Sequence, residues 1–535
     1  MRAIRISAAI GAAAISIGLL VATDGSTSAA PRIATDKITW AKCTTGLEAQ
    51  LGFECGMLSL PLDYAKPASG YVSIAVSRRK HTSTTAAYQG VMIMNPGGPG
   101  GAGKWLPMMA DFFPADVAAA YDWIGYDPRG IGDSVPALSC DSTYLNPNRP
   151  AYVPGTIKLE NSWRARAQGY AASCAKKGGT LLSHMGTLEN VRDIESLRVA
   201  LKQDTINFYG YSYGTYLGQV YATMYPNQVR RMVLDSNVGA SSVWQQSNLD
   251  QNQAFEKVMT KFFAWMAKYD SVYHLGKTEA AVEATWYKTL DKLAVKPAGG
   301  AIGPSEMTDI FLNAGYLQMF WPELATDLAG WVNKAKFAPL VEWYGSGGDD
   351  NSYAAYLSTI CADAPWSRTW SNWKSETVKS QTSAPYATWG NAWYNAPCAT
   401  WPVAARPRLS VGTSAGPAIL LLDETLDGAT PYAGSLETRQ LFPNSRLIAT
   451  VGGTSHASSP SGLPCVDDQI SAYLLSGTIV ARKPGLAADS SCAALPPGIP
   501  DEVVATVKPA QVVTAQVTVS DTLERAALWR LTWRG

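Results

Sequence analysis

The segment Gly210-Tyr211-Ser212-Tyr213-Gly214 has the spacing of a nucleophile elbow, in which one serine stands between two glycines, each two residues away. It follows an apolar, strand-like run and precedes a helix-like run. A turn from strand to helix this sharp brings the flanking residues nearly into contact, so glycine is favoured because it lacks a Cβ atom. The pattern predicts Ser212 as a nucleophile, and the alternative is an ordinary tight turn.

A serine hydroxyl needs a base to accept its proton. The sequence has four histidines: His81, His184, His274 and His456. In a hydrolase built on such an elbow the partners follow in the order serine, acid, histidine. Two histidines precede Ser212 and His274 lies in a helix-like segment, whereas His456 lies in the loop GGTSHASS after the last strand-like run. We therefore predict His456 as the base.

The acid that orients this histidine should follow a strand between the serine and the histidine. The stretch AILLLDETLDGATPY places Asp423, Glu424 and Asp427 beyond an apolar run. We favour Asp427 because the Gly-Ala-Thr-Pro turn after it could direct its carboxylate back to His456. Asp423 is the second choice, and Asp235, which follows the run RRMVL, is the third.

Acyl transfer also needs two N–H groups that bind the developing oxyanion. One donor should be Tyr213, the residue after the nucleophile. The glycine-rich loop NPGGPGGAG (95–103) should supply the other, with Gly98 preferred and Gly97 next. A phosphate-binding loop is the alternative for this segment, but the Gly-Lys-Ser/Thr ending of a P-loop is missing.

The elements around these motifs predict an α/β fold with a mostly parallel sheet, because short apolar runs alternate with helical patterns from Tyr71 onward. From about Gly239 to Pro407 the pattern becomes helical and rich in tryptophan, which suggests a helical cap inserted into the sheet. The expected division is a signal peptide (1–30), the first part of the core (31–238), the cap (239–407), the second part of the core (408–492) and an unassigned tail (493–535).

The N-terminal residues indicate export. Two arginines precede an apolar stretch that is followed by small residues, and we expect cleavage near Ala29 or Ala30 and a secreted protein. No later apolar run approaches the ~20 residues that a membrane span requires. The 44 basic and 43 acidic residues nearly balance, which argues against nucleic acid as a partner.

Eight cysteines agree with export, and they contain no close pair of the kind that binds metal ions. They fall into four local couples, for which we expect disulfides: Cys43–Cys55, Cys140–Cys174, Cys361–Cys398 and Cys465–Cys492. The alternative is that some of them remain free, buried thiols.

Several segments together resemble the secreted tripeptidyl aminopeptidases of actinomycetes, in the proline-iminopeptidase-like branch of the α/β-hydrolases. They occur in the family's order over residues 38–492: LPLDYAKP, NPGGPGGAG, GYDPRGIGDS, GYSYGTYLG, NAWYNAPCATWP, DGATPY and GGTSH. The resemblance implies the triad Ser212, Asp427 and His456, the same disulfide pairing, and no metal or organic cofactor. The chain departs from the pattern at Asn95-Pro96, where proline iminopeptidases usually have histidine, and in its tail after Cys492.

The resemblance implies a serine exopeptidase that acts on peptide or protein N-termini and releases tripeptides. Such an enzyme must bind a free α-ammonium, and Glu256 and Asp363 are the candidate carboxylates in the cap. We expect a monomer. A carboxylesterase on the same scaffold is the alternative, because fold and triad do not select amide over ester. A non-catalytic, aromatic-rich binding protein is disfavoured by the complete triad in the required order.

Overall fold

The computed structural model describes residues 37–345, 348–500 and 503. The predicted signal peptide and most of the predicted tail lie outside these residues. Within them the chain forms one ten-stranded sheet, in the order β1-β2-β3-β5-β4-β6-β7-β8-β9-β10. The strands are β1 (Ala41–Lys42), β2 (Glu54–Pro61), β3 (Tyr71–Arg79), β4 (Val91–Asn95), β5 (Asp122–Tyr126), β6 (Ile206–Tyr211), β7 (Val229–Asp235), β8 (Ile419–Glu424), β9 (Arg446–Val451) and β10 (Ser490–Ala493).

The sheet is parallel from β5 through β10 and antiparallel only at the β1, β2 and β3 side. Alternate residues of the central strands face opposite sides, as the two-residue period of a strand requires. Ile93, Phe208 and Leu234 belong to one apolar core, and Tyr209 and Val233 to the other. Both faces are therefore covered, which confirms the predicted α/β class with a mostly parallel sheet.

Helices cover the two faces of the sheet. One face packs against α4 (Thr187–Ala200), α5 (Tyr213–Met224) and α15 (Ala433–Leu441), and the other against α2 (Ala115–Ala120) and α16 (Pro464–Ser476). Short helices α1 (Gly46–Gln50), η1 (Pro67–Ser69), η2 (Leu106–Phe112), η3 (Leu181–His184) and η4 (Pro226–Gln228) complete this part of the chain.

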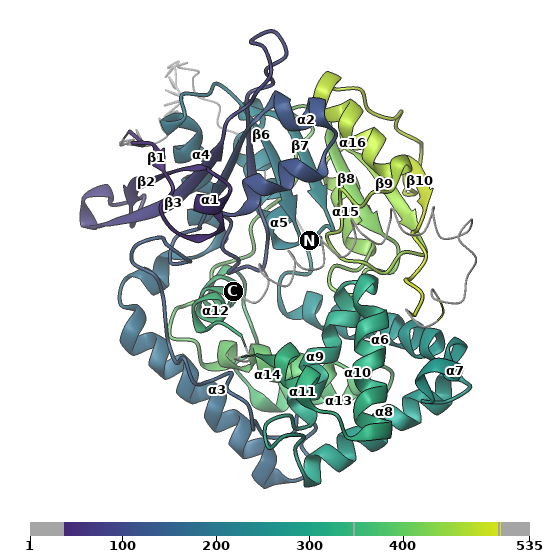
Figure 1. Cartoon of the computed structure of the whole chain (residues 1–535). Coiled ribbons are helices and arrows are strands. Elements are labelled where there is room, and N and C mark those ends of the chain that lie inside the picture. Colours follow the sequence, from purple (N-terminus) through teal and green to yellow (C-terminus); the bar gives the residue numbers. More distant parts are fainter. Residues whose placement is uncertain (1–36, 346–347, 501–502, 504–535) are drawn as a thin grey trace, which may run out of the picture. The chain divides into compact units, whose positions relative to one another are not determined.

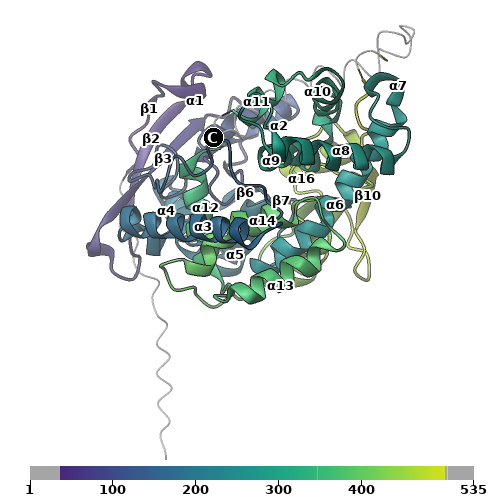
Figure 2. The same cartoon turned by 90° about the horizontal axis from the view of Figure 1, so that it is seen from below.

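A helical cap interrupts the sheet between β7 and β8 (Figure 1). Its helices are α6 (Gln245–Lys268), α7 (Asp270–Tyr273), α8 (Glu279–Val295), α9 (Pro304–Tyr316), η5 (Gln318–Phe320), α10 (Trp321–Lys334), α11 (Ala338–Tyr344), α12 (Asp350–Asp363), α13 (Trp370–Gln381), α14 (Thr388–Asn395) and η6 (Ala396–Thr400). The cap has an apolar core of its own, in which Phe262, Trp286 and Phe311 are fully buried. In Figure 2, which looks from the cap side, α6, α9, α12 and α14 surround β6 and β7 in projection.

The segment before β6 also contacts the cap, which the division of the sequence does not anticipate. Helix α3 (Ile157–Gly178) packs against α14 (Figure 1). The rings of Trp163 and Trp393 stack between these helices, with their centroids 5.7 Å apart. Arg149, upstream of α3, forms ion pairs with Glu306 and Asp309 of α9. Cap contacts therefore extend well outside residues 239–407.

Four disulfides join the same cysteine pairs that the spacing suggests: Cys43–Cys55, Cys140–Cys174, Cys361–Cys398 and Cys465–Cys492. Each closes a local loop, with sequence separations from 12 to 37 residues. No helix of the described part of the chain is both long and apolar enough to span a bilayer. The start of the predicted tail contacts the cap, because the Leu495 and Gly498 carbonyls accept hydrogen bonds from Gln318 and Trp265.

Candidate active site

The backbone at Ser212 turns directly from β6 into α5. Its φ of 55° and ψ of −123° lie outside the conformations that non-glycine residues favour. A Cβ atom on Gly210 would lie 2.4 Å from the Gly214 carbonyl oxygen, and one on Gly214 would lie 2.8 Å from the Asn95 carbonyl oxygen. Side chains are excluded on both sides of the serine, so the two glycines serve the purpose that the sequence suggests. The turn leaves Ser212 at the N-terminus of α5 and at the carboxyl edge of the sheet.

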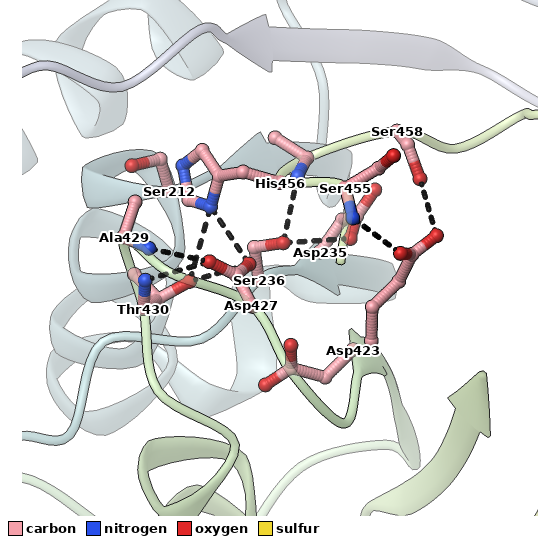
Figure 3. Close-up of polar contacts among 12 residues, drawn as sticks. Ser212, Asp235, Ser236, Asp423, Asp427, Ala429, Thr430, Ser455, His456 and Ser458 are labelled. Carbon is pink, nitrogen blue, oxygen red and sulfur yellow. Dashed lines mark hydrogen bonds and ion pairs between the residues drawn. The ribbon is translucent and has the colours of Figure 1, made fainter. Parts of the chain in front are cut away.

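Two further site residues that the sequence predicts lie next to each other. Nδ1 of His456 is 2.8 Å from Oδ2 of Asp427, and both side chains are fully buried (Figure 3). Among the described residues, the opposite ring nitrogen, Nε2, has no hydrogen-bond partner. Figure 3 shows Ser212 beside the imidazole ring. This arrangement leaves one ring nitrogen available to accept a proton next to a serine.

The Asp427 carboxylate is held by four donors. Oδ1 accepts hydrogen bonds from the N–H groups of Ala429 (2.7 Å) and Thr430 (2.9 Å). Oδ2 accepts from the Thr430 hydroxyl (3.0 Å) as well as from His456. The Thr430 hydroxyl also lies 3.2 Å from Nδ1 of His456. The turn after Asp427 therefore fixes the carboxylate and contacts the imidazole, a role of Thr430 that sequence reasoning missed, although the residue stands within the DGATPY motif.

Three other carboxylates surround the loop that carries His456. Asp235 accepts hydrogen bonds from the Ser459 N–H and hydroxyl, and Glu424 accepts from the Ser455 N–H and the Ser458 hydroxyl. Asp423 accepts from Ser435. The two alternatives to Asp427 that the sequence left open, Asp423 and Asp235, thus bond to serines, and in the described part of the chain neither bonds to the imidazole.

Burial changes the acidity of these three groups. It raises the pKa of Asp235 to about 6 and that of Glu424 to about 8, and it raises the pKa of Asp423 well above its ordinary value. The negative charge of Asp427 contributes in the same direction to each pKa. At neutral pH the Glu424 carboxyl, with a pKa of about 8, therefore mostly holds a proton, whereas Asp235, with a pKa of about 6, is mostly ionised.

The glycine loop that is predicted to supply an oxyanion donor lies close to the serine. A Cβ atom on Gly97, whose φ is 98°, would lie 2.9 Å from Cβ of Ser212 and 3.1 Å from the Tyr213 nitrogen. The Gly97 N–H is occupied, because it donates to Oδ1 of Asn95. Among the described residues, the N–H groups of Gly98 and Tyr213 donate no hydrogen bond. These contacts favour Gly98 over Gly97 as the donor from the glycine loop.

The two carboxylates predicted to bind an amine accept hydrogen bonds from the chain itself. Glu256 accepts from the Tyr386 N–H, and Asp363 accepts from the N–H and the hydroxyl of Thr187. Burial raises the pKa of both, that of Asp363 to about 6. The structure does not bring either carboxylate into hydrogen-bond contact with Ser212, Asp427 or His456 in its described part, and their role remains a prediction.

One contact to the active site comes from the cap and was missed from the sequence. The His456 N–H donates to the Tyr316 carbonyl oxygen at 2.7 Å, and the two rings meet edge to face at 5.5 Å. Tyr316 is the last residue of α9. Nothing in the sequence around Tyr316 distinguishes it from the other tyrosines of the cap, so only the structure could reveal this contact.

Comparisons with known proteins show the family of this chain. Residues 384–492 match the family model described as TAP-like protein. The tripeptidyl aminopeptidase of Streptomyces lividans is 38% identical over 86% of this chain and 88% of its own length. The serine protease Hip1 of Mycobacterium tuberculosis is 28% identical over 82% and 89%, and carboxylesterase B of the same organism is 29% identical over 79% and 84%. The chain belongs to the tripeptidyl aminopeptidase family of α/β-hydrolases.

Proposed function

We propose that this protein is a serine exopeptidase that removes tripeptides from peptide N-termini. The observation that carries the proposal is the placement of His456, whose Nδ1 is bonded to Asp427 while Nε2, without a partner in the described chain, lies on the ring beside Ser212. The relatives named tripeptidyl aminopeptidase support the choice of peptides as substrates.

In the proposed mechanism, Nε2 of His456 accepts the Ser212 hydroxyl proton as the oxygen attacks the scissile carbonyl carbon. The proton on Nδ1 stays in its hydrogen bond to Asp427, which stabilises the imidazolium. The N–H groups of Gly98 and Tyr213 bind the oxyanion of the tetrahedral intermediate. The imidazolium then protonates the leaving amine, and the scissile C–N bond breaks.

Deacylation repeats these steps with water as the nucleophile. His456 takes a proton from water, the hydroxide attacks the acyl-enzyme carbonyl, and the same two N–H groups bind the second oxyanion. Collapse of this intermediate breaks the ester bond to Ser212, and the imidazolium returns the proton to the serine oxygen. The products are a tripeptide with a new carboxylate and a shortened peptide.

Labelling by a fluorophosphonate probe tests the serine chemistry, because the probe reacts only with an activated serine. Wild-type protein should be labelled and Ser212→Ala should not; an unlabelled wild type would refute the proposal. Chromogenic tripeptidyl substrates with free and acetylated N-termini test the exopeptidase activity. Equal rates on both would exclude an enzyme that recognises the free amine.

A carboxylesterase is the second candidate, and the relative named carboxylesterase B favours it. The same triad and oxyanion donors cleave esters without any change. Tripeptidyl anilides, simple acyl anilides and acyl esters of p-nitrophenol, compared at equal concentration, separate the two activities. We expect kcat/KM to be higher for the tripeptidyl anilide than for simple acyl anilides, whereas an esterase would show no gain from the peptide.

We also propose that the protein works outside the cytoplasm. Four disulfides suit an oxidising compartment, and the N-terminal sequence has the pattern of an export signal. Fractionation of the producing cells and N-terminal sequencing of the exported protein test this. A mature N-terminus near residue 30 or 31 is expected.

A further inference from the structure

Helix α9 has one face that is not buried. From Ser305 to Tyr316 only Asp309, Leu312, Asn313 and Tyr316 are half-buried, and the other residues are buried. Spacings of three, four and seven residues place these four side chains on one side of a helix. We call this face the α9 stripe. Opposite it, residues such as Phe311 pack into the core of the cap.

One end of the α9 stripe is fixed at the catalytic base. The carbonyl oxygen of Tyr316 accepts the His456 N–H at 2.7 Å, and the Tyr316 ring lies 5.5 Å from the imidazole. Phe255 of α6 packs against Tyr316 from another side, at 5.3 Å between ring centroids. The α9 stripe therefore begins beside the triad.

The other end of the α9 stripe carries a negative charge. Asp309 pairs with Arg149 through Oδ2 (2.5 Å) and accepts the Tyr152 hydroxyl on Oδ1 (2.7 Å). Arg149 also pairs with Glu306, so two carboxylates share one guanidinium among the described ion pairs. The Asp309 side chain is 36% exposed, whereas that of Glu306 is fully buried. Two carboxylates and one guanidinium leave one negative charge in excess, and of the two carboxylates only that of Asp309 is accessible to water.

Tyr394 connects this charge with the oxyanion loop. It is 39% exposed, yet it lies close enough to Tyr316 and Asp309 that their charges add to burial in raising its pKa. Its ring is 5.1 Å from that of Tyr356, and the Tyr356 nitrogen would lie 3.1 Å from a Cβ atom on Gly100. Tyr394 and Tyr356 thus form a chain of contacts from the α9 stripe to the glycine loop.

The length of the α9 stripe matches three residues of peptide. Asp309 and Tyr316 are seven residues apart, which is a rise of about 10 Å along an α-helix. An extended chain spans at most ~3.3–3.6 Å per residue, so a tripeptidyl group reaches roughly 10 Å from its ammonium to its scissile carbonyl. We propose that Asp309 binds the α-ammonium of the substrate, and that the α9 stripe thereby sets the cleavage point three residues from the N-terminus. This inference rests on the proposed exopeptidase function.

The variant Asp309→Asn tests the inference, and it leaves Arg149 paired with Glu306. Hydrogen bonds to charged groups contribute ~1.5–3 kcal/mol, so kcat/KM for a free-amine tripeptidyl anilide should fall about 10- to 100-fold, mainly through KM. Hydrolysis of the N-acetylated substrate and the fluorophosphonate labelling rate should stay unchanged. Asp309→Glu should retain most of the preference for a free amine. Asp327→Asn in α10 is the matched control, because this half-buried cap carboxylate accepts a hydrogen bond from Trp343, and we expect it to have little effect.

A second variant, Asn313→Asp, tests the measuring role. It places a carboxylate about 4.5 Å along the helix from Tyr316, so activity should shift from tripeptidyl towards aminoacyl and dipeptidyl anilides. If Asp309→Asn lowers kcat/KM equally for the free-amine and the N-acetylated substrate, Asp309 has only a structural role and the inference is wrong. An unchanged length preference in Asn313→Asp, or an amine-specific loss in Glu256→Gln alone, would also overturn the inference. A wild type that ignores the free amine would instead refute the proposed function.

Discussion

Replacing Asp427 with asparagine should move the proton on His456 from one ring nitrogen to the other. The carboxylate oxygen Oδ1 receives two backbone N–H groups, from Ala429 and Thr430. An amide NH₂ cannot take that position, because it would face two donors. The side-chain carbonyl oxygen of the introduced asparagine must therefore remain there, and its NH₂ group takes the place of Oδ2, 2.8 Å from Nδ1 of His456.

The consequence is a wrong tautomer with nearly unchanged geometry. Nδ1 becomes the acceptor of the amide N–H, so the imidazole proton moves to Nε2, which can no longer accept the proton of Ser212. In serine hydrolases with this arrangement, loss of the correct tautomer lowers kcat by about 10⁴-fold. Because the substitution preserves volume and keeps both backbone contacts, we expect thermal stability to change far less than activity.

The assay is the second-order rate of fluorophosphonate labelling together with kcat for an activated ester, both at neutral pH. Asp235→Asn is the matched control, because that carboxylate is equally buried but bonds to Ser459. We expect Asp427→Asn to lose about four orders of magnitude and Asp235→Asn to lose much less. A folded Asp427→Asn protein that retains a tenth of the wild-type rate, or a larger loss in Asp235→Asn, would refute this reasoning.

Two further changes address groups around the imidazole. Thr430→Val removes the hydroxyl that donates to Asp427 and lies 3.2 Å from Nδ1 of His456. Because a hydrogen bond to a charged group contributes ~1.5–3 kcal/mol, kcat for an ester should fall about 10- to 100-fold. An unchanged kcat would contradict this role of Thr430. The pKa of Glu424 is raised from 4.5 to about 8, so between these pH values the folded state keeps a proton that the unfolded chain releases. The contribution of this bound proton to the free energy of unfolding is complete below pH 4.5 and is lost as the pH rises to about 8. Glu424→Gln should therefore gain stability relative to wild type between about pH 5 and 8 in denaturant titrations, and parallel pH profiles would show the reasoning to be wrong.

The parts of the site that could be predicted from the sequence are those that local geometry dictates. Ser212 stands out because Gly210 and Gly214 are required within five residues of chain, and the glycine loop around Gly98 stands out for a similar reason. The order of the motifs then left one suitable histidine. These features need no knowledge of which distant segments meet, so the sequence alone indicates them.

The choice among the acids depends on tertiary structure. Asp235, Asp423 and Asp427 all lie at or just beyond the carboxyl ends of β7 and β8, which are adjacent parallel strands. Their sequence contexts cannot show which carboxylate faces His456. The distinction arises because Asp235 and Asp423 are directed to serines, whereas the turn after Asp427 directs its carboxylate to the imidazole.

The cap could be predicted as helical, but its contacts with the active site could not. Arg149 lies far upstream of α9 in the sequence, and its pairing with Glu306 and Asp309 spans about 160 residues of chain. Amphipathic patterns report which face of a helix is buried, and they do not report its partner. For this reason the sequence suggested Glu256 and Asp363 as amine ligands, whereas the proposal of Asp309 depends on the contacts of the folded cap.

The cap of this protein is bonded to both loops that carry the base and the acid. Tyr316 of α9 accepts the His456 N–H, and Gln251 of α6 donates to the Ala429 carbonyl oxygen at 2.6 Å, two residues after Asp427. A cap that only selected substrates would need neither contact. Because both hydrogen bonds end on the backbone of catalytic loops, any displacement of α6 or α9 moves the imidazole and the carboxylate relative to Ser212. If the peptide binds along α9 as proposed, these two hydrogen bonds connect that binding to the triad, so a smaller effect on kcat should accompany the main effect on KM.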